Sequence, residues 1–244
     1  MFTVLRADLR SLFDYGPFKI RRIHPGQILP AGDDGAFGPL SVIDHVNLGV
    51  GAEVSLHEHK NDEIFNYIWQ GSMVHQTSDG QRTPLSPKKL MMINAGQSFW
   101  HQESTPIVPA EVLQIYIRPW QADLTARIQF VSRPEGIATN QWTLLAGPEG
   151  QSAPLEIRQQ LFIYDIRLDH QGQSPVPQQA GLAQWLYVMD GEVAIGGHVL
   201  YKGDAIASAD LALPVVTSTG NSTLLCFCVD LAAIVVTDGT ISGL

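Results

Sequence analysis

Short apolar runs bounded by glycine, proline, aspartate and asparagine recur along the whole chain. The clearest ones span residues 40–43, 64–69, 90–93, 112–117, 161–166, 185–189, 224–229 and 234–236. Many short strands separated by turn residues are typical of an antiparallel sandwich or barrel. A helical period is hard to find, and the clearest candidate helix runs from Leu5 to Phe13. The pattern therefore predicts an all-β fold, with a helix expected only near the start.

One strand pattern occurs twice, 120 residues apart, since Tyr67 corresponds to Tyr187. In both copies an apolar strand ends in a polar residue and a glycine, Gly71 in the first copy and Gly191 in the second. Such repetition indicates two copies of one structural unit. A polar stretch over residues 132–141 separates them. We therefore expect two tandem β-barrels of the jelly-roll type, with a first domain over residues 1–131 and a second over residues 132–244.

The composition changes this picture mainly by what it excludes. The net charge is −9, with 15 Lys plus Arg against 24 Asp plus Glu, which opposes binding to a phosphate backbone. No run approaches the roughly 20 apolar residues of a membrane helix, and the charged N-terminus is unlike a signal peptide. We expect a cytoplasmic monomer that binds neither nucleic acid nor membrane. Cys226 and Cys228 are expected to be buried thiols and not a disulfide.

Two pairs of potential metal ligands stand at alternate positions of the expected strands. His57 and His59 form one pair, and His101 and Glu103 form the other. Side chains two residues apart on a strand project from one face, about 6.5 to 7 Å apart along the chain. A lone His-x-His is often a surface accident, but two such pairs beside apolar strands can bring four ligands to one ion. Histidines with a carboxylate and open positions favour Fe(II), and manganese, nickel, copper or zinc would also accept these ligands.

The two pairs lie within longer patterns. The chain reads H-x-H-x3-E from His57 to Glu63 and A-G-x4-H-x-E from Ala95 to Glu103. In this order the two patterns resemble those of the pirin family of bicupins, and the resemblance covers residues 14–120 well and the remainder in outline. It implies two cupin domains and one divalent transition metal, Fe(II) first. The implied metal ligands are His57, His59, His101 and Glu103.

The first pattern departs from ordinary cupins at its acidic residue. Those proteins have an acidic ligand seven residues before the motif's last glycine, a position that is Ile64 here. Glu63 is one residue earlier, so strand alternation turns it to the other face. We interpret Glu63 as structural or as a neighbour of the ligands, and Glu103 as the carboxylate that replaces it. Lys60 and Asn61 also depart from the resemblance, because the family usually has Arg and Gly there.

The remaining histidines and the second repeat are not expected to bind metal. The first histidine pair corresponds to Pro177 and Gln179 in the second repeat, so the C-terminal cupin should lack ligands. His170 and His198 are interpreted as isolated loop or surface residues. His75 is either an ordinary strand residue or a hydrogen-bonding neighbour of the ligands.

The resemblance also implies a function. Pirin relatives are associated with quercetin 2,3-dioxygenase activity, so the leading hypothesis is an oxidoreductase that takes a flavonol-like aromatic substrate and dioxygen. In that scheme the flavonol 3-hydroxyl binds the metal, and Glu103 is the general base. One alternative is a non-enzymatic regulator, whose redox-sensitive iron changes the surface presented to a protein partner. Another gives the metal only a stabilising role.

Overall fold

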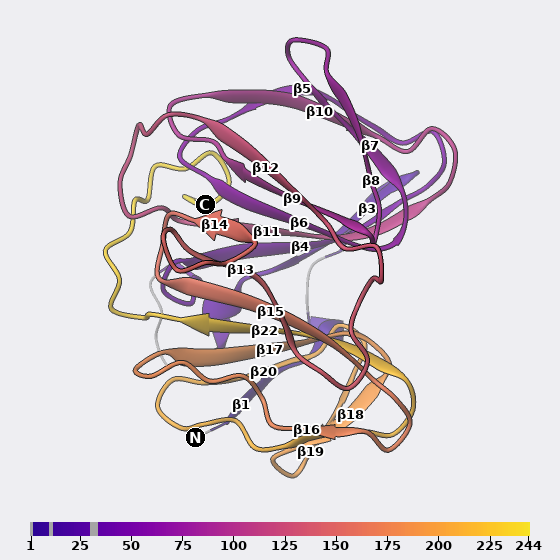
Figure 1. Cartoon of the computed structure of the whole chain (residues 1–244), viewed down its shortest axis with the longest axis vertical. Helices are drawn as coiled ribbons and strands as arrows, with labels where there is room; N and C mark the ends of the chain where they lie inside the picture. Colours follow the sequence, from indigo (N-terminus) through magenta and orange to yellow (C-terminus); the bar gives the residue numbers. More distant parts are fainter. Residues whose placement is uncertain (1, 10–11, 30–33) are drawn as a thin grey trace. The chain divides into compact units, whose positions relative to one another are not determined.

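The computed structural model describes residues 2–9, 12–29 and 34–244, and nearly all of its regular elements are strands (Figure 1). The chain divides into two compact units whose segments alternate in sequence. We call them the N-terminal unit (residues 12–24, 40–136 and 234–244) and the C-terminal unit (residues 2–9, 25–29, 34–39 and 137–233). The domain limit placed between residues 131 and 132 from the sequence stays a prediction.

The N-terminal unit consists of two antiparallel sheets. The larger has the order β12 (Arg127–Ser132), β9 (Lys89–Asn94), β6 (Glu63–Gly71), β11 (Ala110–Ile117), β4 (Leu40–Leu48), β3 (Phe18–Ile23) and β2 (Leu12–Tyr15). The smaller has the order β5 (Glu53–His59), β10 (Phe99–Ser104), β7 (Met73–Thr77) and β8 (Arg82–Leu85). One buried apolar cluster joins them, with Ile64 and Met91 from the larger sheet and Met73 and Leu85 from the smaller.

The C-terminal unit also has a seven-stranded and a four-stranded sheet, with a parallel strand pair at one edge of the larger sheet. Its larger sheet has the order β1 (Thr3–Leu5), β20 (Ala205–Ser208), β17 (Ala183–Asp190), β22 (Ser222–Val229), β15 (Leu161–Leu168), β13 (Thr143–Pro148) and β14 (Leu155–Ile157). Its smaller sheet has the order β16 (Gln173–Ser174), β21 (Val216–Ser218), β18 (Glu192–Ile195) and β19 (His198–Tyr201). Two 3₁₀ turns, η1 (Ala7–Leu9) and η2 (Pro25–Ile28), complete the described elements.

The repeat read from the sequence corresponds to β6 and β17. Gly71 and Gly191 follow the apolar part of these strands, and both have a positive φ, 78° and 87°. A Cβ at Gly71 would lie 1.8 Å from the Pro109 carbonyl oxygen, and one at Gly191 would lie 2.5 Å from the Asn221 carbonyl oxygen. Only glycine fits either position without strain. The prediction of an all-β fold with two cupin units is confirmed, although each unit is a pair of open sheets and not a closed barrel.

Two expected elements are wrong. The helix expected from Leu5 to Phe13 is replaced by the end of β1, the 3₁₀ turn η1 and the start of β2, although residues 10 and 11 lie outside the described part. Sheet partners override the weak local period, since β1 pairs with β20 and β2 pairs with β3. Residues 234–236 form no strand. No helix among the described residues is long and apolar enough to cross a membrane.

Candidate metal centre

The two predicted ligand pairs lie on neighbouring strands of the smaller sheet of the N-terminal unit. β5 carries His57 and His59, and β10 carries His101 and Glu103. His101 stands opposite His57 in the antiparallel ladder, and the register shifts between His101 and Glu103. His59, His101 and Glu103 are only 3%, 2% and 4% exposed, whereas His57 is half-buried. The pairing therefore places three donors out of water and leaves His57 on the more open side.

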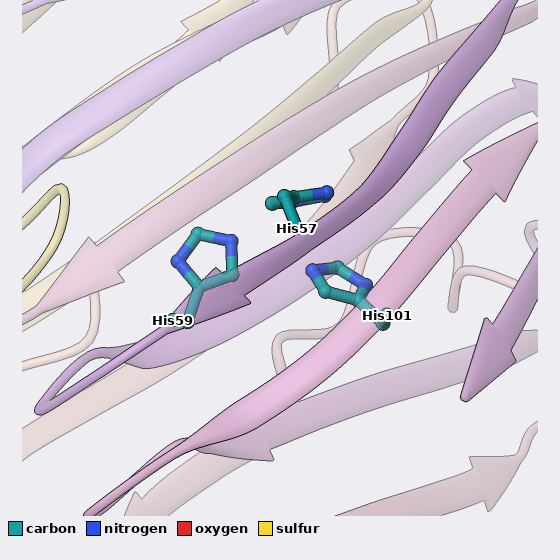
Figure 2. Close-up of side chains that lie close together, drawn as sticks. All are labelled: His57, His59 and His101. Atoms are coloured by element: carbon teal, nitrogen blue, oxygen red, sulfur yellow. The ribbon is translucent and has the colours of Figure 1, made fainter. Parts of the chain in front are cut away.

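The three histidine rings converge on one region (Figure 2). The ring centroids are 4.4 Å apart for His57 and His101, and 4.9 Å apart for His57 and His59. Those of His59 and His101 are 5.2 Å apart. One nitrogen of each ring lies within 4.8 Å of one nitrogen of the other two. Metal–nitrogen bonds of about 2.0–2.1 Å need ligand nitrogens about 3–4 Å apart, so small ring rotations would close this set around an ion.

Two of the rings use Nδ1 for a protein partner. His57 Nδ1 lies 2.8 Å from the Ser55 carbonyl oxygen, and His59 Nδ1 lies 2.8 Å from Oδ2 of Asp62. A carbonyl and a carboxylate oxygen both accept, so in each ring Nδ1 carries the proton and donates. The Nε2 lone pair of both rings is therefore free for an ion.

The third ring is held by another histidine. His101 Nδ1 lies 3.2 Å from His75 Nδ1, and the two strands that carry them are neighbours. His101 Nε2 is buried and has no hydrogen-bond partner among the described residues. If Nε2 binds an ion, Nδ1 of His101 carries the proton and donates to His75. The sequence left open whether His75 is an ordinary strand residue or a neighbour of the ligands. The structure places it beside His101, a predicted ligand.

Glu103 is held on one oxygen and unsatisfied on the other. Its Oε2 accepts a hydrogen bond from Gln114 Nε2 at 2.8 Å, whereas Oε1 is buried without a partner among the described residues. Burial raises the pKa of Glu103 to about 7, and the bond from Gln114 opposes this rise. Glu103 forms a second close group with His75 and His101, and it does not belong to the group of three histidines. Whether all four predicted ligands bind one ion stays a prediction.

Burial favours the neutral form of His57, His75 and His101. Loss of solvent lowers the pKa of His101 far below its ordinary value, and that of His75 to about 4. It lowers the pKa of His57 as well, against a hydrogen bond to Ser55 that raises it. A neutral imidazole has the lone pair that a metal requires. At neutral pH these three histidines therefore offer uncharged nitrogen donors beside one carboxyl group.

These donors fit a divalent transition metal. Two buried atoms that face the cluster, His101 Nε2 and Glu103 Oε1, lack a partner within the described part of the chain. Buried polar atoms without partners are costly, so such a pair calls for a bound species. Imidazole nitrogen and carboxylate oxygen are the donors that Fe, Mn, Ni, Cu and Zn accept.

Several residues around the cluster were missed or underrated by sequence reasoning. Asp62 and Gln114, which hold His59 and Glu103, were not singled out as site residues. An acidic residue three positions after His59 was a signal for the first, but nothing local marked Gln114. Glu63 accepts a hydrogen bond from Asn94 on β9, which agrees with its interpretation as a structural residue.

In the C-terminal unit, the positions that correspond to the first histidine pair have other partners. Gln179 Nε2 donates to the hydroxyl of Tyr164 at 2.7 Å, and the Pro177 carbonyl accepts from Cys228 Sγ at 3.4 Å. Both groups of potential metal ligands found among the described residues belong to the N-terminal unit. A cavity of about 580 Å³ in that unit is lined by the ends of β4, β6 and β11 and by none of the four predicted ligands.

Two family models match the chain. The model described as Pirin matches residues 25–117, which include all four predicted ligands. The model described as Quercetinase C-terminal cupin domain matches residues 144–229. Together they cover a large part of both units.

Among curated relatives, the quercetin 2,3-dioxygenase of Escherichia coli strain K12 is 26% identical over 193 residues, which are 78% of this chain and 82% of the relative. A solved structure of the bacterial pirin YhhW from Escherichia coli in complex with nickel(II) has a TM-score of 0.81 at 22% identity, covering 94% of this chain and 99% of that one. A quercetin 2,3-dioxygenase structure from Acinetobacter baumannii has a TM-score of 0.74 at 18% identity, covering 94% and 79%. At these identities the solved structures show a shared fold.

Proposed function

This chain belongs to the pirin family, and from that premise we propose that it is a metal-dependent dioxygenase acting on a flavonol-like aromatic substrate such as quercetin. The proposal assigns His57, His59, His101 and Glu103 as the metal ligands. Curated relatives named quercetin 2,3-dioxygenase support the reaction type, and the ligand cluster of this chain supports the metal.

One observation carries the proposal. Three imidazoles on two paired strands turn toward one another, and each has its Nδ1 engaged by a protein atom. In an accidental cluster, the same ring nitrogen would not be expected to be hydrogen-bonded to a protein atom in all three histidines. Fixing Nδ1 orients the ring and selects the tautomer that can bind an ion through Nε2.

We propose Fe(II) as the resident metal, with nickel the first alternative, because the bacterial pirin YhhW was solved in complex with nickel(II). When bound, the metal supplies Lewis acidity toward the flavonol hydroxyl and a redox centre for dioxygen. Overall, both atoms of dioxygen enter the substrate, the heterocycle opens and one ring carbon leaves as carbon monoxide.

Glu103 is proposed as the base that takes the flavonol hydroxyl proton. A base works best when its pKa is close to the operating pH, and burial raises the pKa of Glu103 to about 7. Gln114 holds Oε2, so Oε1, the oxygen assigned to the metal, is the atom that would receive the proton once its bond to the metal is released. The burial of His59, His101 and Glu103 keeps water from this proton and from a reactive substrate.

The test is turnover by protein of known metal content. Anaerobically Fe(II)-loaded protein is mixed with quercetin, air is admitted, and flavonol absorbance and carbon monoxide are recorded. We expect the flavonol absorbance to fall and carbon monoxide to be released in stoichiometric amount. His101→Ala should neither consume quercetin nor release carbon monoxide. Protein that holds one iron per chain and leaves quercetin unchanged would refute the quercetin activity and favour the non-enzymatic metal-binding alternative.

A further inference from the structure

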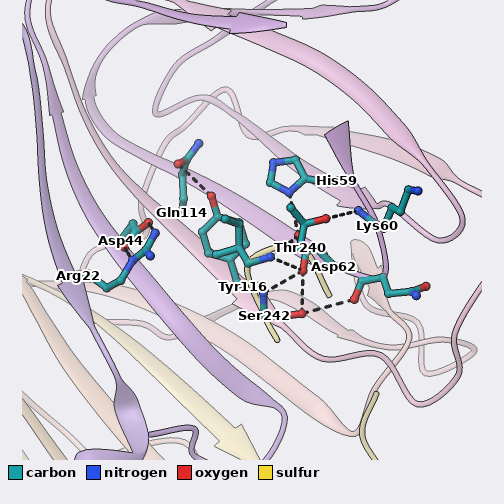
Figure 3. A network of polar contacts seen from close by, with 11 residues as sticks. Arg22, Asp44, His59, Lys60, Asp62, Gln114, Tyr116, Thr240 and Ser242 are labelled. Carbon is teal, nitrogen blue, oxygen red and sulfur yellow. Dashed lines mark hydrogen bonds and ion pairs between the residues drawn. The ribbon is translucent and has the colours of Figure 1, made fainter. Parts of the chain in front are cut away.

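A buried carboxylate connects the end of the chain to one of the proposed ligands. Asp62 is fully buried, and its Oδ2 accepts from His59 Nδ1 at 2.8 Å. Its other contacts come from the C-terminal segment. The Ser242 backbone amide donates to Oδ1 at 2.9 Å and the Ser242 hydroxyl donates to it at 2.7 Å. The Ile241 amide is shared between the two oxygens, at 3.3 and 3.2 Å (Figure 3).

The C-terminal segment is itself held in place from several sides. The Ser242 carbonyl accepts from Ser41 Oγ at 2.6 Å and from Arg118 Nε at 2.7 Å. Further back, Thr240 and Lys60 exchange two hydrogen bonds: the Lys60 amide donates to Thr240 Oγ1 at 2.8 Å, and the Thr240 amide donates to the Lys60 carbonyl at 3.0 Å. The donors to Asp62 are therefore fixed in position before any ligand binds.

The segment also fits Asp62 closely in space. A Cβ added to Gly239 would lie 2.1 Å from Ser242 Oγ and 2.6 Å from Asp62 Oδ1. No side chain fits there unless the serine or the carboxylate moves. Residue 239 therefore has to be glycine for the segment to reach Asp62.

We propose that residues 240–242 and Asp62 form a positioning relay, in which the C-terminal segment aims Asp62 and Asp62 presents His59 Nε2 to the metal. The proposal rests on the metal site proposed above. It assigns roles to Asp62 and residues 240–242, which are not among the proposed ligands. Asp62 and Ser242 touch neither metal nor substrate in this scheme. They act through the His59 ring, as carboxylate partners of metal-binding histidines do.

The tautomer of His59 is the direct consequence. A carboxylate can only accept, so it keeps the proton on Nδ1 and the lone pair on Nε2. In Asp62→Asn the oxygen stays with the Ser242 donors, and the amide nitrogen then faces His59 Nδ1 and donates to it. The ring proton moves to Nε2, where it blocks metal binding. Aspartate and asparagine have nearly the same shape, so the expected effect comes from the position of the His59 ring proton.

The first experiment measures the tautomer and the metal affinity of Asp62→Asn separately. Nitrogen-15 NMR of the metal-free protein at pH 8 reports which nitrogen of His59 carries the proton, and calorimetric titration with Ni(II) reports affinity. We expect the wild-type ring to carry the proton on Nδ1, the variant ring to carry it on Nε2, and the affinity to fall about 10- to 100-fold. The matched control is Glu63→Gln, which removes the charge of the adjacent buried carboxylate, bonded to Asn94, and should retain wild-type affinity.

The second experiment perturbs the relay by substitutions in the C-terminal segment. Ser242→Ala removes one of the donors to Asp62 and should lower Ni(II) affinity about 2- to 5-fold. Gly239→Ala should lower it further, because the new methyl group displaces the serine or the carboxylate. Gly220→Ala is the control, since a Cβ there meets nothing within 4 Å. Combining Ser242→Ala with Asp62→Asn should add nothing to Asp62→Asn alone, because both act through one contact.

The outcomes separate the relay from the metal site. Wild-type protein that binds no Ni(II) and no Fe(II) refutes the proposed function, and the His59 tautomer in Asp62→Asn then decides the relay alone. Wild-type protein that binds metal, together with an Asp62→Asn variant of unchanged tautomer and affinity, overturns the relay and leaves the function standing. An equal loss of affinity in Asp62→Asn and Glu63→Gln would also overturn it, because it would show only that a buried carboxylate stabilises the fold.

Discussion

The smaller sheets of the two units have equivalent strand orders but differ where the site lies. In the N-terminal unit the smaller sheet has the order β5-β10-β7-β8, and in the C-terminal unit the equivalent order is β16-β21-β18-β19. β5 and β10 are seven and six residues long, whereas β16 and β21 are two and three. The strand pair that carries the histidines is thus reduced to short stubs in the C-terminal unit.

The polar residues that face the site differ in the same way. Asn66 and Gln114 stand opposite each other on β6 and β11, and Gln114 donates to Glu103. The equivalent pair on β17 and β22 is Leu186 and Cys226, and both belong to the apolar core of their unit. A metal site in this fold therefore needs ligand strands of sufficient length and polar residues on the facing sheet, because a buried carboxyl group without partners is costly.

The largest loss of metal affinity is expected from removing His101, the histidine that belongs to both groups of potential ligands. His101→Ala should lower Ni(II) affinity about 1000-fold, or about 4 kcal/mol, because a bound metal distributes its free energy over only a few ligands. Calorimetric titration measures the loss. His170→Ala in the C-terminal unit, an exposed histidine bonded to the Thr219 carbonyl, should bind metal as the wild type does. Equal affinity in His101→Ala and wild type would remove His101 from the site.

The pH dependence of Glu103 gives the next largest effect. Its pKa is raised from 4.5 to about 7 in the folded protein, so the folded state binds this proton more tightly than the unfolded state. Metal-free wild type should therefore lose about 3 kcal/mol of stability relative to Glu103→Gln as the pH rises from 4.5 to 7, and no more above that range. The histidines with lowered pKa destabilise both proteins equally below pH 6.5, so they cancel in the difference. Urea unfolding at pH 4.5, 5.5, 7 and 8 measures it, and a difference that does not change with pH would contradict the account.

Copying a residue of the C-terminal unit into the site should have a moderate effect. Gln114→Cys installs the residue found at the equivalent position of β22 and removes the donor to Glu103 Oε2. With one oxygen released, Glu103 is less well oriented, and Ni(II) affinity should fall about 10-fold. An unchanged affinity would mean that the facing sheet contributes nothing to the site.

A truncation at the equivalent position of the C-terminal unit should have the smallest effect. Cys226 is fully buried in the apolar core, so Cys226→Ala should lower the free energy of unfolding by about 1 kcal/mol through lost packing. Metal affinity should stay at the wild-type value. A fall in metal affinity would show that this unit takes part in metal binding and would end the contrast between the two units.

The central strands of the two larger sheets were predictable because their signals are local. Apolar runs between turn residues identified seven of the eight strands expected, and the glycines at the ends of β6 and β17 identified the repeat. The failures were short segments without a strong pattern of their own. Leu5 pairs with Ala205 and the Val236 amide donates to the Pro119 carbonyl, whereas Leu12 and Phe13 pair with the adjacent strand β3. A local pattern does not specify the two distant partners.

In the candidate site, only the residue pairs that follow from alternation along a single strand were predictable. His57 with His59, and His101 with Glu103, are pairs within a single strand, so their spacing placed them on one face. The contact between His75 and His101 spans 26 residues, and the one between Asp62 and Ser242 spans 180. Contacts of this length depend on sheet register and on the path of the chain end, and no spacing in the sequence encodes them.

The central claim is that three imidazoles and one carboxylate of the N-terminal unit surround a single cation. Anomalous diffraction at the metal edge, from crystals of protein loaded with Fe(II) or Ni(II), tests it most directly. The account predicts one peak per chain, about 2.0 to 2.2 Å from Nε2 of His57, His59 and His101 and from Oε1 of Glu103. A peak ligated by His75 in place of His57 and His59, or one outside this cluster, would contradict it.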